Sequence, residues 1–204
     1  MTRFARTTLF LLIAGLCAAC MTAPDKKYFH LSLASRPSPQ PIDMVLYVDY
    51  PGIVNPYNDF RIVYRVSPFE VSYYPYVFWT DKAGAVVRDA VARFLKAGGD
   101  FRSVILETDE IEPDLVLKSR IQRIEEVDEG DFWYAHLAVE FKVADYKSGK
   151  ILAARTFDRR EPMASKSVLQ FPVTVSRILA EELDAVLSDL RSSVSALRTQ
   201  KRDP

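Results

Sequence analysis

Two stretches of this chain have the periodicity of an amphipathic helix, and a long region without that periodicity separates them. In residues 80–99 and again in residues 171–197, apolar side chains recur at steps of three and four and fall on one stripe. A helix with a single apolar stripe buries only one face. Each helix is therefore expected to pack by that face on a sheet.

The ends of both helices carry recognisable residues. Thr80 or Asp81 is expected to cap the free amide groups at the start of the first helix. Gly98 and Gly99 follow its last apolar position and should end it. Pro172 suits the first turn of the second helix, because that turn leaves its amides without helical acceptors.

The rest of the chain reads as β-strands joined by turns. Tyr28–Leu33 and Met44–Tyr50 have strand character, and Arg61–Trp79 reads as a hairpin. Residues 103–162 contain further strands with short turns, which indicates an antiparallel meander. We therefore expect an α+β fold, a single domain in which two helices pack on one curved, mostly antiparallel sheet.

The charge balance argues against nucleic acid as a partner. The chain has 27 basic and 27 acidic residues, so its formal net charge is zero. Nucleic-acid binders usually carry a basic excess or a basic stripe, and neither is evident here.

The N-terminus has the order of a secretory signal peptide. Arg3 and Arg6 precede the apolar run Leu9–Leu16, and the small residues Ala18 and Ala19 follow it. The run is far shorter than the roughly 20 apolar residues that a membrane-spanning helix needs. We therefore interpret it as part of a signal peptide and expect residues 1–19 to be removed.

A cysteine after two small residues makes this segment resemble a bacterial lipoprotein precursor, although Cys17 stands where leucine is usual. That resemblance implies cleavage before Cys20, attachment of lipid to Cys20, acylation of the new amino terminus, and a lipidated tether over residues 20–27. The domain would then occupy residues 28–204. A plain cleaved signal peptide and a Cys-x-x-Cys redox or zinc site are the alternatives, and the latter lacks a second ligand pair.

No set of residues has the spacing of a catalytic or metal site, so we expect neither an enzyme nor a cofactor. His30 and His136 each fall within a predicted strand and are interpreted as structural. An acidic cluster could bind calcium, but its spacing does not match a calcium loop, and a solvated hairpin turn is the favoured interpretation. The cluster comprises Glu125, Glu126, Asp128, Glu129 and Asp131.

The densest unusual feature is aromatic, in residues 73–79, YYPYVFW. Neighbouring strand residues point to opposite faces, so both faces would carry aromatic side chains. One interpretation is a contact surface for a protein or lipid, formed by Tyr73, Tyr74, Tyr76 and Trp79. The alternative is that both faces are buried. Stacking on single-stranded nucleic acid is a third interpretation, but the sequence shows no sign of the positive groove that such binding needs.

Together these segments resemble the ABC-type transport auxiliary lipoprotein family, which includes the paraquat-inducible protein C type. The main match is residues 62–95, in which Tyr64, Arg65 and an aromatic strand lead through Trp79 into a helix. Residues 114–128, 135–145 and 149–158 resemble the strands that follow in the family.

The resemblance implies a non-enzymatic accessory of a system that moves lipid between the inner and outer membranes. Its partners would be ABC-type transport components and a mammalian-cell-entry (MCE) domain protein, with assembly of the lipoprotein into a ring as a further implication.

The chain would be anchored by its acyl chains at the periplasmic face of the outer membrane. Met21 after Cys20, in place of aspartate, favours that membrane in enteric-type sorting, with the inner membrane as the alternative. A structural lipoprotein that organises the envelope or a secretion assembly is the second function.

Intact-mass measurement of the mature protein tests the lipid anchor. We expect a chain that begins at Cys20 and carries acyl groups, and a Cys20→Ser variant that is largely lost from the membrane fraction, because the acyl chains supply most of the attachment. An unmodified chain that begins at Met1 in the membrane fraction would contradict this.

Overall fold

The computed structural model describes residues 24–34 and 36–200, so the signal peptide and Cys20 lie outside the described residues. In chain order the elements are β1 (Lys27–Phe29), β2 (Ile42–Val48), β3 (Gly52–Ile53), β4 (Arg61–Ser67), β5 (Glu70–Trp79), α2 (Ala83–Gly98), β6 (Phe101–Ile105), β7 (Leu115–Glu129), β8 (Phe132–Asp145), β9 (Ile151–Pro162) and α3 (Gln170–Gln200). No helix in this part of the chain is long and apolar enough to cross a membrane.

Strand β7 organises the sheet. Along one edge it pairs antiparallel with β8 over its whole length, and β8 pairs antiparallel with β9. Along the other edge it pairs in parallel with three short strands, β2, β3 and β4. Strand β6 adds to β2, and β5 followed by β1 adds to β4. The result is one mixed, open sheet whose longest pairings are antiparallel.

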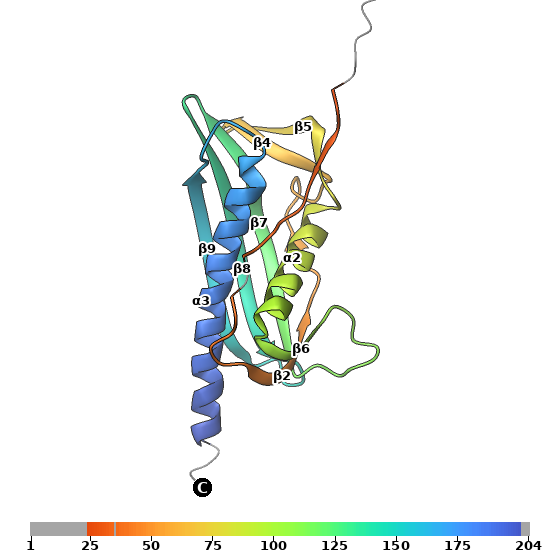
Figure 1. The fold of residues 1–204 in the computed structure, drawn as a ribbon, viewed down its shortest axis with the longest axis vertical. Helices are drawn as coiled ribbons and strands as arrows, with labels where there is room; N and C mark the ends of the chain where they lie inside the picture. The colour runs from red at the N-terminus through yellow and green to blue at the C-terminus, as the bar shows by residue number, and fades with distance from the viewer. Residues whose placement is uncertain (1–23, 35, 201–204) are drawn as a thin grey trace, which may run out of the picture.

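Both helices pack on this sheet and share its core (Figure 1). Helix α3 lies over β8 and β9, and α2 lies beside β2 and β6. The N-terminal segment runs between the two helices, where Leu31 is fully buried. The Leu31 carbonyl accepts a hydrogen bond from Arg93 of α2 at 3.2 Å, which holds the segment in place.

The structure confirms the α+β class, the hairpin of β4 and β5, and the meander of β7, β8 and β9. It corrects the position of β6, which is not part of the meander but pairs in parallel with β2. The physical reason is the crossover through α2, which returns the chain beside an earlier strand in the same direction. The first predicted strand is also shorter, since β1 ends at Phe29.

The predicted cap of α2 is wrong. The helix begins at Ala83, its N-cap residue is Lys82, and no side chain caps it. Asp81 instead accepts a hydrogen bond from the neighbouring Lys82 amide at 2.6 Å. The Ala83 amide donates to the carbonyl of Asp59 at 3.3 Å. A backbone carbonyl of a loop therefore accepts from the first turn of the helix, where a capping side chain was expected. The predicted stop is confirmed, because Gly99 ends the helix in the left-handed conformation at φ 67°.

Trp79 lies in the core and not on a surface. Its side chain is 2% exposed, and its ring lies 5.8 Å from that of Phe171 on α3. As the last residue of β5, Trp79 is covered by the helix that packs on this side of the sheet. The expectation that it forms part of a contact surface is therefore corrected.

We expect Trp79→Ala to lower the free energy of unfolding by about 3–5 kcal/mol, because it leaves a large cavity between sheet and helix. Phe69, which is 96% exposed, provides the control, and Phe69→Ala should change stability by less than about 0.5 kcal/mol. Urea unfolding followed by circular dichroism measures both. Equal effects of the two substitutions would contradict the assignment of Trp79 to the core.

Candidate functional site

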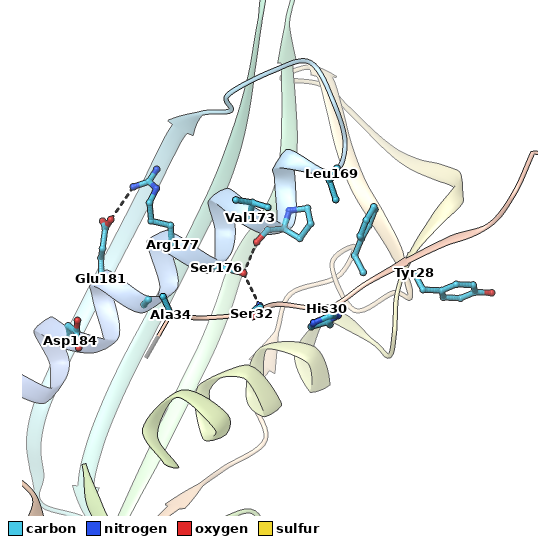
Figure 2. A pocket seen from close by; sticks show the side chains of 13 residues that line it. Tyr28, His30, Ser32, Ala34, Leu169, Val173, Ser176, Arg177, Glu181 and Asp184 are labelled. Atoms are coloured by element: carbon cyan, nitrogen blue, oxygen red, sulfur yellow. Dashed lines mark hydrogen bonds and ion pairs between the residues drawn. The ribbon is translucent and has the colours of Figure 1, made fainter. Parts of the chain in front are cut away.

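A groove separates the N-terminal segment from α3 (Figure 2). The segment, residues 28–34, forms one wall, and the first half of α3 forms the other. The two walls are joined at the base, because the Ser32 amide donates to Ser176 Oγ at 3.0 Å. Ser176 Oγ in turn donates to the carbonyl of Pro172 at 2.7 Å, so this hydroxyl positions the walls.

The groove has an apolar half and a charged half. It encloses about 620 Å³. On α3 and the residue just before it, the lining residues form two rows with a spacing of four, which places each row along one side of the helix. Both rows begin apolar and end charged; they are Leu169, Val173, Arg177 and Glu181, and Pro172, Ser176, Ala180 and Asp184.

The apolar half is open to solvent. Leu169 and Val173 are 53% and 56% exposed, and Tyr28 at the mouth is 60% exposed. Tyr28 also stacks on Phe78, with ring centroids 5.5 Å apart. Exposed apolar side chains that converge in one groove are typical of a binding site for an apolar segment.

The charged half is already paired. Arg177 contacts Glu181 at 3.1 Å, and Asp184 contacts Arg36, which follows the N-terminal segment, at 2.7 Å. The guanidinium groups of Arg159 and Arg177 lower the pKa of Glu181 and keep it ionised. The groove therefore presents little uncompensated charge, and an apolar ligand is a better fit than an ionic one.

A second feature lies on β7, where two adjacent carboxylates are buried. Glu125 is fully buried and Glu126 is 1% exposed, so the interpretation of the acidic cluster as a solvated turn is wrong for these two. The turn itself is confined to Gly130 and Asp131, because β7 continues to Glu129. Among the described residues, no group of His, Cys, Asp and Glu side chains is placed to hold a metal ion.

Glu125 lies in a network drawn from three segments. Tyr57 donates to its Oε2 at 2.8 Å and Arg65 at 3.1 Å, and His136 Nδ1 lies 3.6 Å from its Oε1. Burial opposes ionisation, but the contacts with His136, Tyr57 and Arg65 outweigh it and lower the pKa of Glu125 to about 2. The contact with Glu125 and a 2.5 Å contact with Asp158 raise the pKa of His136.

Glu126 has the opposite character, although it is the next residue. Tyr74 donates to its Oε1 at 2.5 Å, while its Oε2 has no hydrogen-bond partner. Burial without a cationic partner raises the pKa of Glu126 to about 7. A carboxyl group with such a pKa is largely protonated in mildly acidic conditions.

The aromatic run does not form one continuous surface. Tyr73 is half-buried, donates to the Pro56 carbonyl at 3.3 Å and lies under Arg61. Tyr74 is half-buried over Glu126, and Tyr76 is 40% exposed. Of the predicted set, Tyr76 alone is well exposed.

Sequence reasoning missed the groove. Val173 lies off the apolar stripe of α3, which passes through Val175, Ile178 and Leu179, and Leu169 directly precedes the helix. Apolar residues on the otherwise polar side of a helix were the available signal.

The chain matches the family model described as ABC-type transport auxiliary lipoprotein component over residues 31–189. The chain belongs to this family. Membership confirms the resemblance in the sequence, and it makes the chain an accessory lipoprotein of the cell envelope that associates with ABC-type transport components. Much of the groove of this auxiliary lipoprotein, including its α3 wall, lies within the matched residues.

Solved structures confirm the fold of this auxiliary lipoprotein. A Xanthomonas campestris protein of the DUF330 family has 20% identity and a TM-score of 0.66, over 87% of this chain and 98% of its own. A protein described only as uncharacterized has 12% identity and a TM-score of 0.65, over 82% of this chain and 99% of its own. No curated protein matches the chain.

Replacing Glu126 by glutamine tests its protonation. Between its ordinary pKa of 4.5 and about 7, Glu126 releases its proton in the unfolded chain but keeps it in the folded one. The stability that neutral Glu126 contributes is therefore fully present below pH 4.5 and is lost as the pH rises to about 7. We expect Glu126→Gln to match the wild type near about pH 4 and to exceed its unfolding free energy by about 1–3 kcal/mol near about pH 8. Urea unfolding across this range measures the difference.

Glu125→Gln is the matched control at the adjacent position. It should destabilise the auxiliary lipoprotein near neutral pH, since it leaves Arg65 without its buried partner. A difference between Glu126→Gln and the wild type that does not change with pH would mean that Glu126 ionises normally.

Proposed function

We propose that this chain is the lipid-anchored docking subunit of an ABC-type system that moves lipid between the inner and outer membranes. In this proposal Cys20 carries the acyl chains, the anchor lies in the outer membrane, and an MCE-domain protein is the docked partner. The family match over residues 31–189 supports the accessory role. The observation that carries the docking role is the apolar groove formed beside the segment that leads to the anchor.

The groove suits a partner segment with apolar side chains. Its exposed side chains, Leu169 and Val173, would be covered on docking, and burial of apolar area drives most protein association. Its base is fixed, because Ser32 and Ser176 join the walls, so little ordering is needed when the partner binds. Charged pairs at the far end give a polar rim around this apolar centre.

Two further elements belong to the proposal. Tyr76 is the part of the aromatic run that a partner can reach, two residues from the Phe78 ring at the groove mouth. Assembly of several copies into a ring would place several grooves around one partner. A structural envelope lipoprotein is the second candidate, and it would use the groove to bind components of an envelope or secretion assembly instead.

Affinity purification from solubilised envelopes tests the proposal, with Val173→Asp as the variant and Ile151→Asp as the control. Both side chains are more than half exposed, but Ile151 lies at the start of β9, away from the groove. We expect Val173→Asp to reduce recovery of the MCE-domain protein and the ABC permease about tenfold or more, because a charge replaces buried apolar contact. Ile151→Asp should recover both as the wild type does.

Two results would overturn the proposal. Equal recovery with both variants would remove the groove as the docking site. Recovery of envelope-assembly components in place of transport components would favour the structural function.

A further inference from the structure

Three turns of the chain meet at one end of the sheet. Parallel pairing of Tyr64 with Glu126 places the turn between β4 and β5 beside the turn between β7 and β8. The connection from β9 to α3 joins them, because the Met163 amide donates to the Trp133 carbonyl at 2.8 Å and the Lys166 side chain contacts Gly130. We call this end of the domain the turn end.

The turn end carries exposed aromatic side chains where turns usually carry small polar ones. Phe69, in the turn between β4 and β5, is 96% exposed, and Phe132, at the start of β8, is 62% exposed. Val66 beside them is 55% exposed. Neither phenylalanine lines the groove, so docking of a partner there would leave both in water.

The N-terminal segment leaves the domain toward this same end (Figure 1). Seven residues, 20–26, separate the start of β1 from the proposed lipid on Cys20. Fully extended, seven residues reach about 25 Å, so the anchored domain must lie close to the bilayer. Because the segment leaves at the turn end, the proposed anchor would turn that end toward the membrane.

We propose that the turn end is a second membrane contact, in which Phe69 and Phe132 enter the interfacial region of the bilayer that holds the acyl chains. The inference rests on the proposed anchor at Cys20. An interfacial aromatic or aliphatic side chain adds affinity by burying apolar area at the level of the headgroups. Two such contacts beside one tether fix the tilt of the domain as well as its distance from the membrane.

The charges at the turn end favour a lipid surface over a charged partner. Arg160 pairs with Glu129, and Lys166 lies 3.8 Å from Asp131, so these two basic groups are compensated. Glu70 adds an acidic group at the start of β5. A surface without a basic excess does not require anionic lipid. Phosphatidylethanolamine should therefore suffice, and added salt should not release the contact.

An environment-sensitive fluorophore measures the contact in the acylated full-length mature protein. Phe69→Cys and Phe132→Cys each provide a labelling site, since lipid occupies the sulfur of Cys20. Ile151→Cys is the control, because that residue is also more than half exposed but lies at the opposite end of the sheet. The protein is placed in vesicles of the zwitterionic lipids phosphatidylethanolamine and phosphatidylcholine, with and without brominated lipid as a quencher.

We expect labels at positions 69 and 132 to show blue-shifted emission and quenching by the brominated lipid, and a label at 151 to show neither. In the Cys20→Ser chain, removal of both phenylalanines (Phe69→Ser with Phe132→Ser) should lower residual vesicle binding about tenfold or more.

The outcomes separate the two proposals. Labels at 69 and 132 that stay in water on a vesicle-anchored protein would overturn the membrane contact and leave the anchor intact. Burial of these labels only after partner protein is added would assign the turn end to that partner and overturn the contact with lipid. A mature protein without acyl groups would overturn the anchor itself.

Discussion

The structure depends on the pairing of β7. This one strand is antiparallel to β8 along one edge and parallel to β2, β3 and β4 along the other. It therefore fixes the register of four strands, and through them the positions of β9, β6 and β5. Both helices then cover apolar positions that this register brings together. A change in the register of β7 by one residue would turn every one of its side chains to the other face of the sheet.

The position of β7 also explains its two buried carboxylates. Adjacent strand residues point to opposite sides, so Glu125 and Glu126 enter different surroundings. Glu125 meets Arg65 and His136 and is stabilised as an ion, whereas Glu126 meets the hydroxyl of Tyr74 and no cation. Burial costs a lone carboxylate more than a paired one, and this is the main reason that the pKa of Glu126 is raised while that of its neighbour Glu125 is lowered.

The periodicity of the sequence was sufficient for the fold class, both helices and the long hairpins, because these follow from local patterns of apolar residues. The candidate site did not follow in this way. Glu125 looked solvated because charged residues near a turn usually are, and its partners come from segments far apart in the chain. The groove pairs residues 28–34 with α3, which is more than 130 residues away. Trp79 was included in the predicted contact surface because the sequence of an aromatic strand is the same whether or not a helix covers that strand.

The groove and the turn end are connected through α3. Leu169 is the last residue of the connection that forms part of the turn end, Val173 lies in the first turn of α3, and the charged ends of both rows lie further along the helix. The apolar half of the groove therefore opens toward the end where the N-terminal segment leaves, and the polar half points away from it. With the proposed anchor at that end, this order would match the change in polarity from a bilayer surface to the aqueous phase. A partner segment in the groove would meet its most apolar contacts nearest the membrane, where competition from water is lowest.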